Sequence, residues 1–310
     1  MTNYLTSTIP DPKLADTYVG RYVHGVLDFD VLKNAQKNGE NVIISGPTGA
    51  GKTLFVRAFA ASTGQPFVNV TGDGSLTPED LFGQFYGDAE LPDTLRWISG
   101  PVLEVVLSGG ILNLDEVNFL RGKVTAALHG LFDGRRVLTM LKHPFKYFDP
   151  KDGHYFIKAD DAPTAAVKKR LVPVTGPAYI PAHPDLLVVA SYNPDYQDTA
   201  PLNEAFANRF SRKVEWDYDA DVEARLIFGA TIKDLAAALR TARKGGEIRT
   251  DVSTNLLMSF EEMALDEDLT FAFAQSMFLS HFPPAEQPVV SSLFDLHKVG
   301  LMEDYGWEAI

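Results

Sequence analysis

As far as residue 217, short apolar runs alternate with segments of helical periodicity. The apolar runs are rich in Val, Ile and Leu, which is typical of strands buried on both faces of a parallel sheet. Five such strands are predicted, at 41–45, 66–70, 111–115, 186–191 and 213–217. Helices are predicted between them, at 53–61, 78–83, 122–132 and 201–207. The pattern favours a three-layer α/β fold, in which helices cover a parallel five-stranded sheet.

The pattern changes after Asp217. Three longer segments, 222–243, 253–265 and 269–281, are predicted to be helices, with breaks at Gly245-Gly246 and Pro283-Pro284. No further strand is predicted. We therefore expect a boundary near Tyr218, between an α/β core at 1–217 and a small all-α domain at 218–310.

Composition narrows the class of protein. The 310 residues are 45% hydrophobic and 22% charged, as in ordinary globular proteins. The formal net charge of −13 makes a general affinity for nucleic acids unfavourable. The absence of cysteine excludes disulfides, thiolate zinc sites and a cysteine nucleophile. No apolar run is long enough to cross a membrane and residues 1–16 are polar, so a cytoplasmic protein without a membrane partner is expected.

Residues 46–53 read Gly-Pro-Thr-Gly-Ala-Gly-Lys-Thr, which fits the phosphate-binding loop pattern G-x-x-x-x-G-K-[ST]. The motif lies between a predicted strand and a predicted helix, where backbone N–H groups and the helix N-terminus can bind a phosphate. We expect Lys52 to contact the β- and γ-phosphates and Thr53 to bind Mg²⁺. The expected nucleotide-binding residues are Gly46, Pro47, Thr48, Gly49, Ala50, Gly51, Lys52, Thr53 and Leu54.

Polar side chains end two other predicted strands. Asp115 and Glu116 follow the apolar run Ile-Leu-Asn-Leu, and two adjacent carboxylates there are costly unless both are used. Asp115 is expected in the Mg²⁺ shell, and Glu116 is expected to polarise the attacking water. Asn193 ends the strand at 186–191 and is expected to hydrogen-bond that water or the γ-phosphate. Arg209, after the predicted helix at 201–207, is either a surface residue or a charge-stabilising finger.

Residues 134–173 form an unusual stretch between predicted strands. They contain nine Lys or Arg residues against four Asp, interleaved with five aromatic residues. Two interpretations remain open: a solvated hairpin insertion, or a loop that contacts a substrate or partner, since long insertions in compact domains are commonly functional.

The order of these motifs resembles the AAA+ ATPases, specifically the MoxR-like group and its CbbQ/NorQ branch. The sequence Val-Ala-Ser-Tyr-Asn-Pro-Asp-Tyr-Gln at 189–197 is very similar to that branch's sensor-1 segment. Residues 76–83 and 252–257 also resemble its helix-2 and sensor-2 regions. The resemblance spans about residues 18–257 and implies a P-loop NTPase core followed by an α-helical lid.

The resemblance also implies site residues and partners. Lys52 and Thr53 match Walker A, Asp115 and Glu116 match Walker B, Asn193 matches sensor 1, and Arg209 matches the arginine finger. Tyr18 and Val19 would lie along the adenine. The implied protein is a hexameric, chaperone-like ring that hydrolyses ATP with Mg²⁺ and remodels or activates a protein partner, possibly with a von Willebrand A-domain protein. The alternative is a nucleic-acid-dependent motor or restriction-type NTPase that uses 134–173 for contact.

One position departs from the branch pattern. Asn255 stands where the branch usually has an arginine, and an amide cannot supply a cation to the γ-phosphate. Either the sensor-2 cation is absent, or a nearby arginine such as Arg249 replaces it.

Overall fold

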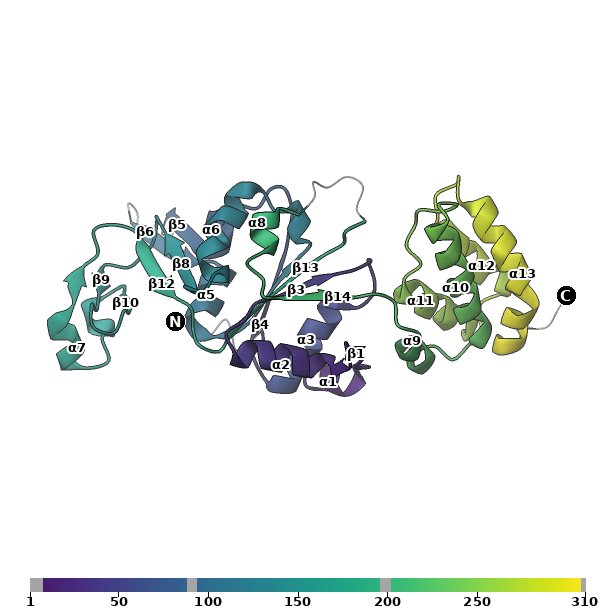
Figure 1. Ribbon diagram of the computed structural model, residues 1–310, viewed down its shortest axis with the longest axis horizontal. Coiled ribbons are helices and arrows are strands. Elements are labelled where there is room, and N and C mark those ends of the chain that lie inside the picture. The colour runs from purple at the N-terminus through teal and green to yellow at the C-terminus, as the bar shows by residue number, and fades with distance from the viewer. Residues whose placement is uncertain (1–7, 88–93, 196–201, 308–310) are drawn as a thin grey trace. The chain divides into compact units, whose positions relative to one another are not determined.

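The computed structural model describes residues 8–87, 94–195 and 202–307 (Figure 1). Its contacts divide the chain into two units. The first contains Met1–Tyr18, Val23–Ser45 and Thr53–Glu215, and the second contains Val19–Tyr22, Gly46–Lys52 and Trp216–Ile310. The phosphate-binding loop therefore groups with the C-terminal helices, and each unit is described by itself.

A parallel five-stranded sheet forms the centre of the first unit, which confirms the predicted fold class. The strand order is β14-β3-β13-β7-β4. The strands are short because each carries only a brief apolar run, and they are buried between helices. Their bounds are β3 Val42–Ser45, β4 Phe67–Thr71, β7 Gly110–Asp115, β13 Leu186–Tyr192 and β14 Arg212–Glu215.

Helices cover the sheet on both sides. Figure 1 shows α2 and α3 on one side, with α5 and α6 on the other. The inward side chains, among them Leu112, Val188 and Phe132, are almost completely buried. The helices of this part of the chain are α1 Lys13–Thr17, α2 Asp28–Lys37, α3 Lys52–Thr63, α4 Pro78–Phe82, α5 Pro101–Ser108, α6 Gly122–Phe132 and α8 Glu204–Ala207. The helix predicted at 201–207 is thus shorter, and Pro201 lies outside the described residues.

Several further short strands lie outside the central sheet, and the sequence did not predict them. Those that have only two residues are too short to show an alternating pattern. The strands are β1 Tyr22–Val23, β2 Val26–Leu27, β5 Gly83–Gly87, β6 Leu95–Ser99, β8 Val137–Met140, β9 Tyr147–Phe148, β10 Tyr155–Phe156, β11 Val172–Pro173 and β12 Ala178–Pro181.

In the basic insertion at 134–173, β8 pairs with β12, and the β8 residues Leu138 and Met140 pack in the main core. The later part of the insertion forms a small sheet of its own. Strand β9 pairs with both β10 and β11, and the short helix α7 Ala165–Arg170 lies in the connection between these two strands. The rings of Phe148 and Tyr155 lie 4.7 Å apart. The carboxylate of Asp149, which is fully buried, forms an ion pair of 2.7 Å with Arg170. The Arg170 guanidinium lowers the pKa of Asp149 to about 2, so the pair stays charged at neutral pH.

The second unit contains five helices after β14 among the described residues: α9 Ala220–Leu226, α10 Ala230–Lys244, α11 Thr254–Ala264, α12 Phe271–Ser280 and α13 Gln287–Tyr305. The prediction of one helix at 222–243 was wrong. The extended backbone of Ile227 ends α9, and Gly229 caps the start of α10. The N–H of Gly229 donates to the buried carboxylate of Glu261, which stabilises the break. Helix α13 was not among the predicted segments.

Candidate functional site

The carboxyl ends of neighbouring parallel strands bring the predicted acidic and amide residues to one edge of the sheet. Strand β7 ends at Asp115 and pairs with β13, where Ala190 lies opposite Leu114. Asn193 follows the end of β13 directly. Strand β13 pairs in turn with β3, whose last residue, Ser45, precedes the phosphate-binding loop. Carboxyl edges of α/β sheets are the usual location of ligand sites.

Both carboxylate oxygens of Asp115 accept a hydrogen bond at this edge. The hydroxyl of Thr53 donates to one carboxylate oxygen of Asp115 at 2.6 Å. The hydroxyl of Ser191, which is fully buried in β13, donates to the other oxygen. The hydrogen bond between Thr53 and Asp115 brings together the two residues that the sequence predicted as Mg²⁺ ligands. Both offer hard oxygen atoms, the ligand type that Mg²⁺ prefers.

Glu116 has an uncommon backbone conformation. Its φ of +54° lies in the left-handed region, which costs a non-glycine residue about 1 kcal/mol. The neighbouring loop holds this turn closely: the N–H of Gly72 donates to the carbonyl of Asp115 at 2.7 Å. A Cβ atom at Gly72 would lie only 2.3 Å from the carbonyl oxygen of Glu116. Strained residues are concentrated at functional sites, so the conformation singles out Glu116 within the acidic pair.

Asn193 is 3% exposed, and its side-chain oxygen accepts the N–H of Asp195 at 3.0 Å. This Asx-type bond fixes the side chain at the end of β13, next to β7. The residues Tyr196 and Gln197 of the same motif lie outside the described residues.

The phosphate-binding loop belongs to the second unit and links β3 to α3 along the chain. Gly49 and Gly51 have φ values of +71° and +86°, which side chains rarely adopt. Lys52 is only 6% exposed, and its ammonium group donates to the carbonyls of Gly46 and Pro47 at 2.7 and 2.9 Å. A buried ammonium group next to a glycine-rich turn is chemically suited to an anionic ligand.

Tyr18 and Val19 fall in different units of the structure. The Tyr18 ring stacks on Phe29 at 5.1 Å, and its hydroxyl donates to Asp28 at 2.6 Å. Val19 falls in the second unit. The role of both residues at an adenine stays a prediction.

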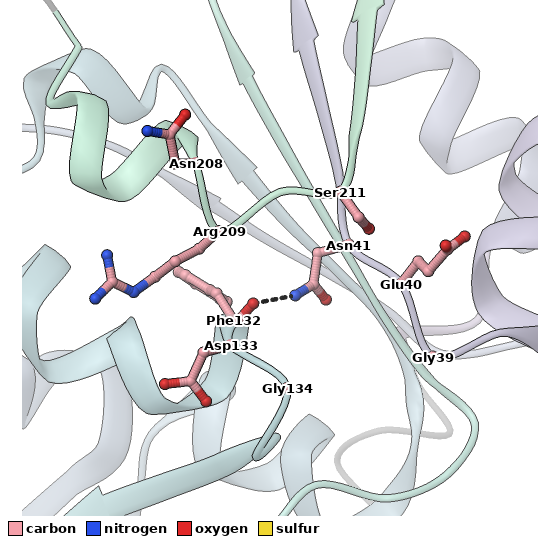
Figure 2. A pocket seen from close by; sticks show the side chains of 9 residues that line it. All are labelled: Gly39, Glu40, Asn41, Phe132, Asp133, Gly134, Asn208, Arg209 and Ser211. Carbon is pink, nitrogen blue, oxygen red and sulfur yellow. Dashed lines mark hydrogen bonds between the residues drawn. The ribbon is translucent and has the colours of Figure 1, made fainter.

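Arg209 lies at the edge formed by the amino ends of the strands, whereas Asp115 lies at the edge formed by their carboxyl ends. Arg209 precedes β14, and Asn41, which lines the same pocket, precedes β3, so both mark the amino ends of parallel strands. Figure 2 shows the Arg209 side chain extending away from Asn41. Its guanidinium donates to the carbonyl of Ala205. Burial lowers the pKa of His129, and the positive charge of Arg209 lowers it further. The pocket measures about 380 Å³ and is lined by Gly39, Glu40, Asn41, Phe132, Asp133, Gly134, Asn208, Arg209 and Ser211.

Asn255 lies in the first turn of α11 and lines a cavity of about 730 Å³ together with Thr48 and Gly49. Arg249 does not line this cavity; it is exposed, and its charge acts on Glu286. The structure therefore gives no support to Arg249 as a replacement for the cation that Asn255 lacks.

The sequence did not predict that Ser191 donates a hydrogen bond to Asp115. It also did not predict that Trp216 and Tyr218 donate hydrogen bonds to the phosphate-binding loop. For Ser191 a signal existed, because it ends a predicted strand two residues before Asn193. Trp216 and Tyr218 contact residues about 170 positions earlier, as the separations of 166 and 170 show, and no local pattern reveals such contacts.

Comparisons with known proteins agree with this geometry. Residues 41–210 match the AAA domain (dynein-related subfamily). The chain is 32% identical to protein CbbQ of Hydrogenophilus thermoluteolus, over 76% of this chain and 79% of that protein. It is 30% identical to the denitrification regulatory protein NirQ of Pseudomonas aeruginosa, over 79% of each chain.

Two further matches are more distant or shorter. Protein NorQ of Paracoccus denitrificans is 30% identical over 71% of this chain and 68% of its own. A solved structure of a RuvB variant from Thermotoga maritima covers 91% of this chain and 81% of its own, at 13% identity and a TM-score of 0.42. The match to the AAA domain at 41–210 includes the phosphate-binding loop, the acidic pair, Asn193 and Arg209. This match and the identity to CbbQ over most of the chain establish the family. The chain belongs to the MoxR-like AAA+ ATPases, as a relative of CbbQ, NirQ and NorQ that hydrolyses ATP.

Proposed function

We propose that the chain hydrolyses ATP as a Mg²⁺-dependent hexameric ring that remodels or activates a protein partner, possibly with a von Willebrand A-domain protein. The description of the relative NirQ as a denitrification regulatory protein supports a regulatory target. A chaperone-like activity and a cytoplasmic location stay predictions from the sequence. No helix in the described parts of the chain has the length and apolar character of a membrane span.

In this proposal the loop at 46–53 binds the phosphates of ATP. Lys52 would neutralise the β- and γ-phosphates, and Thr53 and Asp115 would hold Mg²⁺. The ion would supply charge neutralisation to the transferring phosphoryl group. The contact of 2.6 Å between Thr53 and Asp115 supports this pairing. No cluster of three or more His, Asp or Glu side chains suited to a metal occurs among the described residues. That fits Mg²⁺, which combines few protein ligands with water and phosphate oxygens.

Glu116 would accept the proton of the attacking water, and Asn193 would hold the water or the γ-phosphate in position. The adjacent carboxyl ends of β7 and β13 support these assignments. The left-handed turn at Glu116 adds to them, because it sends the side chain in another direction than a continued strand would.

One observation supports the proposed ring assembly: Arg209 and Asp115 occupy opposite edges of the same parallel sheet. An arginine at the amino edge is too far away to serve a phosphate at the carboxyl edge of its own sheet. It can serve the nucleotide of a neighbouring copy, where its planar guanidinium binds phosphate oxygens in pairs. Catalysis would then require assembly.

Assembly is tested by measuring mass and specific ATPase activity over a range of protein concentrations. We expect an ATP-promoted oligomer, with specific activity falling on dilution in step with the loss of oligomer. Constant specific activity down to a fully monomeric sample would contradict the ring.

The basic insertion is proposed as the partner contact. Lys146, Lys151 and Lys169 are exposed on it, so charge complementarity favours an acidic protein surface. Three of its five aromatic residues pack against one another: the Tyr155 ring lies 4.7 Å from that of Phe148 and 5.6 Å from that of Phe145. This weakens the alternative of a nucleic-acid motor, which needs exposed rings for base stacking. Stimulation of the ATPase by polynucleotide with steep salt dependence would reinstate that alternative.

A further inference from the structure

Side chains from the segment between β14 and α9 hold the carbonyl groups of the phosphate-binding loop. The hydroxyl of Tyr218 donates to the carbonyl of Thr48 at 2.8 Å. The indole N–H of Trp216 donates to the carbonyl of Ala50, also at 2.8 Å. All of these residues belong to the second unit.

Arg21 strengthens the same arrangement. Its guanidinium lies 4.1 Å from the centre of the Trp216 ring and donates to the carbonyl of Ala50 at 3.2 Å. It also donates to the carbonyl of Asp217 at 2.6 Å. Trp216 is therefore held on its face by a cation while its N–H is directed at the loop.

These contacts determine where the N–H groups of the loop point. In a planar trans peptide, the carbonyl of one residue and the N–H of the next point in opposite directions. Fixing the Thr48 carbonyl therefore fixes the Gly49 N–H, and fixing the Ala50 carbonyl fixes the Gly51 N–H. Burial raises the pKa of the Tyr218 phenol, so its hydroxyl remains a donor throughout the physiological pH range.

A second set of contacts continues from Tyr218 into the helices. The Tyr218 ring lies 4.1 Å from the guanidinium of Arg240 in α10. Arg240 makes two hydrogen bonds, of 2.9 and 2.6 Å, to the carboxylate of Glu223 in α9, which is 4% exposed. Glu223 also accepts the hydroxyl of Thr254, the first residue of α11, at 2.7 Å. Glu223 of α9 thus joins Arg240 of α10 to Thr254 of α11.

We propose that Tyr218 is a positioning residue of the ATPase, and that the chain of contacts Thr48–Tyr218–Arg240–Glu223–Thr254 couples occupancy of the phosphate-binding loop to helices α9, α10 and α11. The inference rests on the proposed binding of ATP at residues 46–53. It gives these helices a route to the nucleotide that needs no cation at Asn255. Tyr218 acts only through the loop, whereas Arg240 acts through Tyr218.

Tyr218→Phe is the sharpest variant, because it keeps the ring above Arg240 and removes only the hydroxyl that holds Thr48. Tyr305→Phe is the matched control. The hydroxyl of Tyr305 donates to Glu261 at 3.0 Å in the same unit, and burial likewise raises its pKa, but this hydroxyl lies beside Gly229 and α11 instead of the phosphate-binding loop. Both variants lose one partly buried tyrosine hydroxyl.

Two measurements on the full chain test the coupling. Calorimetry with Mg-ATP measures affinity, and amide hydrogen exchange with and without Mg-ATP measures protection of α9–α11. We expect Tyr218→Phe to raise the Kd for ATP about 3- to 10-fold, the effect of one lost hydrogen bond. At saturating ATP it should also lose most of the nucleotide-induced protection of these helices. Tyr305→Phe should retain the parental Kd and protection.

Arg240→Lys provides a second variant, because lysine keeps the charge but loses the paired bonds to Glu223 and the planar stacking on Tyr218. It should reduce nucleotide-induced protection of α9 and α11 with a smaller change in Kd. Equal effects of the two phenylalanine variants, or full protection in Tyr218→Phe and Arg240→Lys, would overturn the coupling. Failure of the unsubstituted chain to bind ATP would instead overturn the proposed function itself.

Discussion

Asp115 shows how much one residue depends on its neighbours at this site. Its two carboxylate oxygens accept hydrogen bonds from two different hydroxyl groups, that of Thr53 in α3 and that of Ser191 in β13. Charge-assisted hydrogen bonds, in which an ionised carboxylate accepts a hydrogen bond from a hydroxyl, orient the carboxylate before any ligand arrives. The neighbouring residue, Glu116, stays at the same edge but in a different backbone conformation, so the two carboxylates are suited to different tasks.

At this scale, Lys52→Ala should abolish ATP binding measured by calorimetry, because it removes the buried cation expected at the β- and γ-phosphates. Lys37→Ala, an exposed lysine in the last turn of α2, serves as the control and should bind normally. An unchanged ATP affinity in the Lys52 variant would refute the loop assignment.

Glu116→Gln should still bind ATP but hydrolyse it about 10²–10⁴-fold more slowly, as expected for the loss of a general base. The amide keeps the size of the side chain and removes the proton acceptor. Steady-state phosphate release measures the effect, with Glu247→Gln, an exposed residue after α10, as the control. Turnover near that of the control would show that another group activates the water.

Among the elements, the five sheet strands were predictable because each is a short apolar run bounded by polar residues. The sequence also predicted that Asp115 and Asn193 each end a strand, and the parallel pairing of β7 with β13 places both at the carboxyl edge. The break between α9 and α10 was missed because the contacts that stabilise it, from Glu261 and Tyr305, are distant in sequence. The contacts of Trp216 and Tyr218 were missed for the same reason.

The insertion is the element whose removal is most informative. Replacing residues 142–169 by a short glycine linker should spare basal ATPase activity, because these residues lie outside the strands of the nucleotide site. It should abolish stimulation by the proposed protein partner, measured as the ratio of stimulated to basal phosphate release. As a control, Lys146→Ala with Lys169→Ala should reduce stimulation without changing the fold. Full stimulation in the deletion would identify the insertion as a solvated loop.

For the whole molecule, the opposite placement of Arg209 and Asp115 predicts complementation between inactive chains. Arg209→Ala should keep ATP affinity within a few-fold but lose turnover by about 10³–10⁵, the scale of an arginine finger. Mixed with Lys52→Ala, it should regain activity, because one chain supplies an intact loop and the other an intact arginine. The control is a chain with both substitutions, which should restore nothing to either parent. A mixture as inactive as its components would argue against a shared site.

The left-handed turn at Glu116 has a consequence for the evolution and engineering of this protein. Asn and Gly adopt positive φ more readily than Glu, so these two substitutions would relax the backbone and would also remove the carboxylate. Thermal robustness and turnover therefore favour different residues at the same position. Laboratory selection for heat resistance alone would therefore favour variants without ATPase activity. Retention of glutamate at this position in natural relatives would indicate selection for catalysis at the expense of folding stability.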